Sequence, residues 1–154
     1  MATKKILVPY NFSLYDQKAI DFVNQTFSAA ADLEITLFNS YIPMPEIQTD
    51  QSTVMGKLDG NLRYLSQKLK EQEVALKGVK QTLLDSGFTD AQVKYVHQPR
   101  KKDVATDIIK MAWQGGFQVI VLTRKAGKVT RFFTGSVFNR VVSALKDVTV
   151  CIVS

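Results

Sequence analysis

Cysteine and histidine are almost absent from this sequence, and long apolar runs are absent altogether. The 154 residues include one cysteine and one histidine. Without a second cysteine there is no intrachain disulfide, and a zinc site built from histidine and cysteine ligands is excluded. No stretch approaches the roughly 20 apolar residues of a membrane-spanning helix, and the apolar part of the start, MATKKILVPY, is too short for a signal peptide. We therefore expect a cytoplasmic protein that is not inserted in a membrane.

Hydrophobic residues make up 45% of the chain, which is enough for one ordinary globular core without covalent or metal cross-links. We find no internal repeat, low-complexity segment or linker, so the sequence predicts a single domain over residues 1–154. Lysine and arginine number 20 against 14 aspartate and glutamate, which gives a net charge of +6. This excess favours an anionic partner, although a charge of this size is also typical of an ordinary solvated surface.

The N-terminal third alternates between apolar runs and an amphipathic stretch. Residues 4–8 predict a short buried strand that stops at Pro9, because proline cannot donate to a sheet ladder. Ser13 and Asp16 have the spacing of a capping box, which predicts that a helix follows at once. Residues 34–41 predict a second strand. The apolar face of the helix consists of Ala19, Ile20, Val23, Phe27 and Ala30.

A loop and then a long helix are expected next. Residues 43–55 contain two prolines and no apolar period, which indicates a surface loop. Apolar residues at three- and four-residue spacing follow, and they predict a long amphipathic helix closed by Gly87. The apolar residues of this repeat are Leu58, Leu62, Leu65, Leu69, Leu76, Val79 and Leu83.

Three further strands and two helices are expected in the C-terminal part. Residues 91–99, 117–122 and 148–154 predict strands, and residues 103–116 and 136–145 predict helices. Strands that alternate with helices and are mostly apolar indicate a parallel sheet covered by helices on both faces, the doubly wound α/β class. In such sheets ligands bind at the carboxyl ends of the strands, so we expect a site at that edge.

The segment TRKAGKVTRFFTGSV, residues 123–137, joins the fourth expected strand to the last helix. Gly135, Ser136 and Val137 stand where that helix begins, and free amide groups together with the helix dipole favour an anion at such a point. Ser136 can also serve as a plain helix cap, the commoner role of a Gly-Ser pair before a helix. The segment also contains four cations, which either bind phosphate or belong to a solvated loop. They are Arg124, Lys125, Lys128 and Arg131.

Three segments of the sequence resemble those of a known family. They are VPYNFS after the first strand, GSVFNRVV at the last helix and VTVCIVS in the last strand. In order and spacing they resemble the universal stress protein family over nearly the whole chain, which implies five strands in the order 3-2-1-4-5. The family's ATP-binding members share a motif of Gly, two residues, Gly, nine residues, then Gly and Ser or Thr. Counted back from Gly135, Leu122 and Lys125 stand where the first two glycines would be. Gly127 fits the second glycine only in a loop two residues shorter.

The resemblance also implies a site. Asn11 falls where the ATP-binding members carry an aspartate that contacts ribose, and an amide supplies no charge there. The backbone near Ser40 would meet the base and residues 135–137 would meet phosphate. We therefore expect weakened or altered binding of ATP, AMP or another anionic small molecule; the alternative is a dimeric interaction or scaffold protein that binds no nucleotide. The expected ligand-binding residues are Pro9, Asn11, Ser13, Ser40, Arg124, Lys125, Gly127, Lys128, Arg131, Gly135, Ser136 and Val137.

Neither enzymatic activity nor a metal site is expected. A hydrolase or kinase would need a positioned base and a metal carboxylate near the loop, and Asn11 replaces the one candidate acid. His97 has no nearby acid or cysteine with which to form a triad. Asp103 and Asp107 are one helical turn apart, a spacing that suits metal carboxylates but is more often dipole compensation. Trp113 is expected in the core or in a subunit contact.

The sequence bears on two kinds of macromolecular partner. A nucleic acid would suit the basic residues, but no helix carries a basic stripe, which argues against it. The last strand, which begins at Val148 and ends at Val153, is expected at a sheet edge, and an exposed apolar edge needs a cover. The same strand of a second copy would provide that cover, and the family resemblance implies a homodimer through it. Cys151 within this strand is expected to be a small buried side chain.

Overall fold

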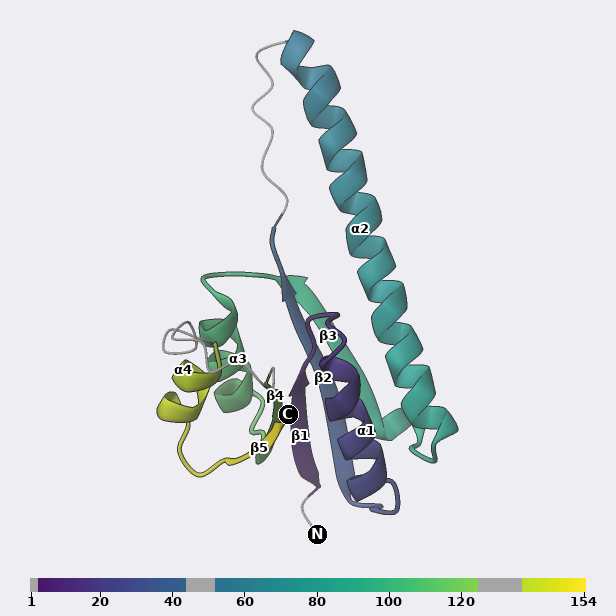
Figure 1. Ribbon diagram of the computed structural model, residues 1–154, viewed down its shortest axis with the longest axis vertical. Coiled ribbons are helices and arrows are strands. Elements are labelled where there is room, and N and C mark those ends of the chain that lie inside the picture. Colours follow the sequence, from purple (N-terminus) through teal and green to yellow (C-terminus); the bar gives the residue numbers. More distant parts are fainter. Residues whose placement is uncertain (1–2, 44–51, 125–136) are drawn as a thin grey trace.

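The computed structural model describes residues 3–43, 52–124 and 137–154, with the side chains of the long second helix described from residue 60 onward. Within these ranges the chain forms one five-stranded sheet in the order β3-β2-β1-β4-β5, which confirms the order implied by the family resemblance (Figure 1). Every neighbouring pair of strands is parallel. The strands are β1 (Lys4–Pro9), β2 (Leu33–Tyr41), β3 (Val93–Pro99), β4 (Val119–Thr123) and β5 (Thr149–Val153).

Helices cover both faces of the sheet, as the doubly wound α/β class requires. On one face lie α1 (Asp16–Phe27) and α2 (Ser52–Asp85), and on the other lie α3 (Val104–Gln114) and α4 (Val137–Ala144). A short 3-10 helix, η1 (Asp90–Gln92), connects α2 to β3. Figure 1 shows that the N-terminal half of α2 extends beyond the ends of the strands, so that only its C-terminal half lies on the sheet.

The sheet divides the core into two layers, because successive residues of a strand point to opposite faces. In β1, Ile6 packs in the layer of α1 and α2, whereas Leu7 packs in the layer of α3 and α4. Leu76 and Leu83 anchor the C-terminal half of α2 on the first face, and all four of these side chains are fully buried. Burying a side chain of this size stabilises the fold by roughly 1.5–3 kcal/mol.

Two boundaries near the N-terminus differ from the expectation. Pro9 is the last residue of β1 rather than the residue that stops it, because the next amide, Tyr10 N, continues the ladder to β2. Helix α1 begins at Asp16, so Ser13 is not its cap, and Ala30 lies beyond its end. Half of the expected capping box is nevertheless present, since Asp16 Oδ2 accepts a hydrogen bond from Ser13 N at 3.0 Å.

The long helix and the strand after it are confirmed with shifted starts. Helix α2 begins at Ser52, so the last residues of the expected loop are helical, while residues 44–51 lie outside the described ranges. Gly87 follows the helix with a φ of +121°, a conformation that favours glycine. Gln92 belongs to η1 rather than to β3, because it forms a capping box with Thr89.

Three expectations about single residues in the C-terminal half can be compared with the structure. Asp103 caps α3, since its Oδ1 accepts a hydrogen bond from Thr106 N at 2.8 Å. Trp113 is 60% exposed, so it does not lie in the core, and the alternative of a subunit contact stays a prediction. Cys151 is half-buried rather than buried, because β5 is an edge strand. None of the helices in the described ranges has the length and apolar character needed to cross a bilayer.

Candidate functional site

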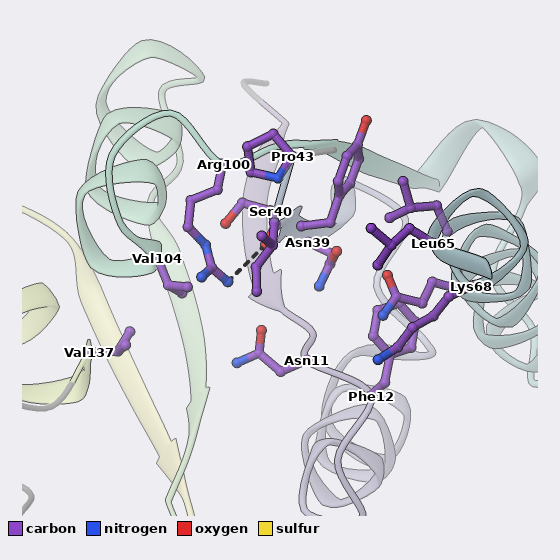
Figure 2. A pocket seen from close by; sticks show the side chains of 14 residues that line it. Asn11, Phe12, Asn39, Ser40, Pro43, Leu65, Lys68, Arg100, Val104 and Val137 are labelled. Carbon is purple, nitrogen blue, oxygen red and sulfur yellow. Dashed lines mark hydrogen bonds between the residues drawn. The ribbon is translucent and has the colours of Figure 1, made fainter. Parts of the chain in front are cut away.

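A cavity of about 440 Å³ lies across the carboxyl edge of the sheet, over the ends of β1 and β2 (Figure 2). On one side it is bounded by α2, through Leu65, Lys68 and Gln72. On the other side it is bounded by Arg100, before α3, and by Val137, the first residue of α4. Ligands bind at this edge in doubly wound sheets, and the volume suits a small molecule. The cavity is therefore the candidate site.

Two consecutive residues of β2 contribute to opposite halves of this cavity. Asn39 lies on the same face of the sheet as Leu37, which packs against α1 and α2. Ser40 lies on the face of Phe38, which packs against α3 and α4. Figure 2 shows Asn11, from the loop after β1, between the two halves. The cavity therefore crosses the sheet edge and has an α2 side and an α3 side.

The charged groups of the lining are basic. Arg100 and Lys68 are its two cations, and no carboxylate belongs to the described lining. The backbone of Arg100 donates from N to Tyr41 O at 2.6 Å, and its Nη2 donates to Ser40 O at 3.3 Å (dashed in Figure 2). These bonds hold the guanidinium against the end of β2. A positive lining of this kind favours an anionic ligand.

Four buried polar atoms of the lining have no hydrogen-bond partner in the described part of the chain. They are Asn39 Oδ1, Ser40 Oγ, Gln72 Oε1 and Arg100 Nε. Buried polar atoms are rarely left unpaired in native proteins. Asn39 and Ser40 are only 6% and 4% exposed, so bulk water does not readily reach them. The cavity thus offers both donors and acceptors to a bound molecule.

A buried carboxylate fixes the loop that carries Asn11. Asp16 is 2% exposed, and its Oδ2 accepts hydrogen bonds from Asn11 N at 2.8 Å and from Ser13 N at 3.0 Å. Its Oδ1 accepts from Thr123 Oγ1 at 3.0 Å. Thr123 is the last residue of β4, so this carboxylate ties the loop after β1 to the end of β4. The loop is thereby held at the cavity.

Phe12, the next residue of this loop, also lines the cavity. Its φ is +61°, in the left-handed region that residues other than glycine rarely adopt. Its ring packs edge to face against the ring of Tyr10, with 5.2 Å between centroids. Backbone strain of this kind is concentrated at functional sites, which agrees with the position of Phe12.

Of the expected site residues that the structure describes, Asn11, Ser40 and Val137 line the cavity. Pro9 and Ser13 do not: Pro9 is buried at the end of β1, and Ser13 is exposed at the start of the helical turn before α1. Their roles in ligand binding remain predictions. The structure therefore brings together the ends of β1, β2 and α4, as expected for a site at the carboxyl edge.

Arg124 lies away from the lining and is bonded to the C-terminal strand. Its N donates to Val153 O at 2.8 Å, and its Nη2 donates to Ser154 Oγ at 3.2 Å. The other expected residues of this segment lie outside the described ranges, and they are Lys125, Gly127, Lys128, Arg131, Gly135 and Ser136.

Sequence reasoning missed the residues that α2 and the segment before α3 bring to the cavity. Lys68 and Gln72 lie one helical turn apart on α2, and Gln72 interrupts the apolar stripe of that helix. Asn39 likewise interrupts the apolar run of β2. A polar residue inside an apolar pattern is a usable signal for a site. Arg100 carries no such signal, because it follows the end of β3 in an ordinary polar connection, and neither does Val104, an apolar residue at the start of α3.

A second cavity of about 460 Å³ lies beside the first, between α2 and β3, and shares Tyr41 and Leu69 with it. The His97 ring lies 4.5 Å from the Tyr41 ring, and His97 Nε2 is buried without a partner among the described residues. Burial lowers the pKa of His97, against the opposite but smaller effect of the Glu73 carboxylate. Tyr95 Oη donates to Glu73 Oε1 at 3.3 Å. This cavity is lined mainly by polar and aromatic side chains, and its lining includes one cation, Lys70, and one carboxylate, Glu73.

Asp103 and Asp107, whose spacing would suit metal carboxylates, both have structural contacts. Asp103 Oδ1 accepts from Arg140 Nη1 at 2.8 Å, and its pKa is lowered first by the backbone hydrogen bond from Thr106 and also by Arg140. Asp107 is buried and accepts from Lys101 N at 3.2 Å. In the described part of the chain, no group of three or more His, Cys, Asp or Glu residues could hold a metal ion.

Leu122, which stands where the first glycine of the nucleotide motif would be, lies within β4. It is 5% exposed and pairs with Ile152 of β5. Its side chain packs in the core layer of α3 and α4. This position therefore serves the core, and a glycine here would leave a space in it.

Comparison with known proteins adds independent findings on the family. A family model, described as the Universal stress protein family, matches residues 2–151. The search among curated proteins finds no match to the chain.

Solved structures match the chain over nearly its full length. A hypothetical protein whose structure served to assign its biochemical function is 22% identical, with a TM-score of 0.67 over 99% of this chain and 96% of that chain. A universal stress protein in complex with cAMP is 17% identical, with a TM-score of 0.64 over 99% and 98%. A universal stress protein from Archaeoglobus fulgidus in complex with dAMP is 15% identical, with a TM-score of 0.65 over 100% of both chains. At these identities the likeness shows the fold.

Proposed function

The chain belongs to the universal stress protein family, and on that premise we propose that it is a ligand-sensing module for an adenine nucleotide or another phosphate-bearing ligand. The ligand would bind in the cavity at the carboxyl edge of the sheet. The observation that carries this proposal is the lining, with two cations, no carboxylate among its described residues and four unpartnered buried polar atoms. The complexes of two related structures with cAMP and dAMP support an adenine nucleotide as the ligand.

The chemistry of the two sides of the cavity suits the two ends of such a ligand. A planar base would lie on the α2 side, against the apolar side chains of Phe12, Leu65 and Leu69. The phosphate would lie on the α3 side, where the guanidinium of Arg100 can donate charge-assisted hydrogen bonds. Asn11, between the two sides, has an amide that can both donate to and accept from ribose hydroxyls.

Two measurements test whether any nucleotide binds. Mass spectrometry of the small molecules released from freshly purified, denatured protein would identify a retained ligand. Calorimetric titration with AMP, ATP and cAMP at a protein concentration of ~100 μM would then detect affinities down to about 1 mM. The proposal is overturned when no ligand is retained and none of the three nucleotides gives a binding signal.

Arg100→Gln tests where the phosphate lies. We expect this variant to bind AMP about 10 to 100 times more weakly, because a charge-assisted hydrogen bond contributes about 1.5–3 kcal/mol. Lys102→Gln is the matched control, since Lys102 is an exposed cation two residues away and does not line the cavity. The double variant Arg131→Ala, Ser136→Ala tests the alternative suggested by the sequence. If only the double variant weakens binding, the phosphate lies at the segment before α4 and not at Arg100.

A dimeric interaction or scaffold role without a nucleotide is the second candidate. The observation that favours it is Leu122, which occupies the position of a motif glycine with a core side chain. The exposed edge strand β5 would be the dimer contact, with Ile152 46% exposed on it. The calorimetric titrations separate the two candidates, because this role predicts no nucleotide binding.

We also propose that the protein acts in the cytoplasm, in a stress response and without catalysis. The stress response is suggested by the family alone, and the location is carried over from the expectation based on the sequence. The absence of catalysis is suggested by Asn11, which stands where an acid could have served a hydrolytic reaction. Release of ADP or phosphate from ATP during the titrations would contradict this part of the proposal.

A further inference from the structure

The α2 side of the cavity ends in two side-chain amides whose oxygens are unpaired. Asn39 on β2 and Gln72 on α2 both line the cavity, and Asn39 Oδ1 and Gln72 Oε1 are buried without partners among the described residues. Asn39 is 6% exposed. Figure 2 shows its side chain between Ser40 and Leu65, within the lining. The structure therefore places an unsatisfied acceptor at the end of the cavity where a base would lie.

The orientation of the Asn39 amide is fixed by its other atom. Its Nδ2 donates to Tyr10 O at 2.8 Å, a buried hydrogen bond between β2 and the end of β1. Turning the amide over would bring two carbonyl oxygens together, so the oxygen and nitrogen cannot exchange places. Oδ1 is consequently an acceptor at a defined position and not a group that can also donate.

A buried acceptor of this kind discriminates between ligands. A ligand group that donates an N–H satisfies the oxygen. A ligand that places a hydrogen bonded to carbon, or a second acceptor, at this point leaves the oxygen unpaired in a site with little water. Sites built to hydrogen-bond a particular ligand group reject analogues that lack it far more strongly than apolar pockets do. The apolar neighbours Phe12, Leu65 and Leu69 supply contact area and cannot supply this discrimination.

We propose that Asn39 is a specificity-determining residue whose Oδ1 accepts a hydrogen bond from an exocyclic amino group on the base of the ligand. The proposal rests on the proposed function and narrows it, because it selects a 6-amino purine over a 6-oxo purine or an unsubstituted one. An amino group carries two hydrogens, so Gln72 Oε1 can accept the second. Neither contact follows from the glycine motif of the family.

Calorimetric titration with matched nucleotides tests the proposal. AMP is compared with purine riboside 5′-monophosphate, which has hydrogen in place of the amino group, and with IMP, which has an oxygen there. We expect the wild-type protein to bind AMP about tenfold more tightly than purine riboside 5′-monophosphate, and IMP more weakly than either. Sugar and phosphate are the same in all three, so the ratio of affinities reports the base alone.

Variants at position 39 assign the preference to Asn39. Asn39→Leu removes the acceptor and is expected to bind AMP and purine riboside 5′-monophosphate equally. Circular dichroism and thermal melting establish that each variant is folded. If Asn39→Leu does not fold, Asn39→Ala, which also removes the amide oxygen and supplies no other acceptor, takes its place.

The possible outcomes separate this proposal from the proposed function. Equal binding of AMP and purine riboside 5′-monophosphate by the wild-type protein would overturn the role of Asn39 and leave nucleotide binding intact. A preference for AMP that survives in a folded variant without the acceptor would also overturn it. If none of the three nucleotides binds, the proposed function fails and this inference fails with it.

Discussion

Asp16 is an acid with almost no contact with solvent, and its surroundings explain why a charge is tolerated there. Its two oxygens accept three hydrogen bonds, from Asn11 N, Ser13 N and Thr123 Oγ1. A buried carboxylate is costly unless hydrogen bonds of this kind replace those it made with water. Two of the three donors belong to the loop that lines the cavity, so Asp16 links the stability of the fold to the shape of the site.

Asp16→Ala should lower the free energy of unfolding by roughly 2–4 kcal/mol, because three donors lose their acceptor at a site that is 2% exposed. Urea denaturation followed by circular dichroism measures the change. Asp21→Ala is the control, since Asp21 is an exposed acid of the same helix, and we expect it to change the stability by less than about 0.5 kcal/mol. Equal losses for the two variants would show that the three hydrogen bonds contribute little.

Prediction from the sequence identified two lining residues at the ends of β1 and β2, and it missed those that α2 and the segment after β3 bring to the cavity. Asn11 and Ser40 were expected at the cavity because the ends of parallel strands meet at one edge, and both line it. Gln72 and Arg100 were not expected, because their approach depends on how α2 and the segment after β3 pack on the sheet. Spacing along the chain contains no information on such tertiary contacts.

At the level of elements, the contact between α2 and the sheet changes from apolar to polar along the strands. Leu76 and Leu83 are fully buried against the sheet. Nearer the carboxyl edge, Gln72 and Glu73 of α2 and His97 of β3 line the two cavities instead. The apolar part holds the helix in place, and the polar part forms the walls of the cavities.

The polar part of this contact predicts a dependence of stability on pH. Burial lowers the pKa of His97, the chain's one histidine, below its ordinary value of about 6.5, while Glu73 opposes this effect. As the pH falls, the unfolded chain therefore takes up the proton before the folded protein does. The stability that neutral His97 contributes is full above about pH 6.5 and is lost as the pH falls from there through the lower pKa of the folded state.

We expect the free energy of unfolding of the wild-type protein to decrease between about pH 7.5 and 5.5, and the decrease to be smaller in His97→Gln. Urea denaturation at a series of pH values measures both. The charged neighbours of His97 in the second cavity, Glu73 and Lys70, are the same in both proteins, so the difference in slope isolates the imidazole. Identical slopes would mean that His97 has the same pKa in the folded and unfolded states.

Element types were predicted better than element boundaries, for a physical reason. The apolar runs of β1, β2 and β4 and the apolar stripe of α2 reflect burial, which is repeated over many residues. Boundaries depend on single contacts: η1 replaces the expected start of β3 because Gln92 reaches back to Thr89. Helix α2 begins at Ser52, where a loop was expected, since the prolines at positions 43 and 45 leave the residues after them free to be helical.

At the scale of the whole molecule, the sheet order was predicted through the family resemblance and not through periodicity. Alternating strands and helices indicate a doubly wound sheet, but they fit more than one strand order. The resemblance of VPYNFS, GSVFNRVV and VTVCIVS selected 3-2-1-4-5, which the structure confirms. The same resemblance places β5 at an edge, and the structure leaves one side of this strand without a neighbour among the described residues.

The exposed edge of β5 leads to a prediction about assembly. An edge strand with apolar residues favours pairing with another chain, so we expect a homodimer through β5, as the family resemblance implies. Ile152→Lys places a charge on this strand at a residue that is 46% exposed, and it should convert the dimer to a monomer. Light scattering coupled to size-exclusion chromatography measures the mass in solution. Val142→Lys, at a residue of α4 that is 41% exposed, is the matched control and should remain dimeric. A wild-type mass of about 17 kDa at ~100 μM, or equal dissociation of both variants, would rule out a dimer specific to β5.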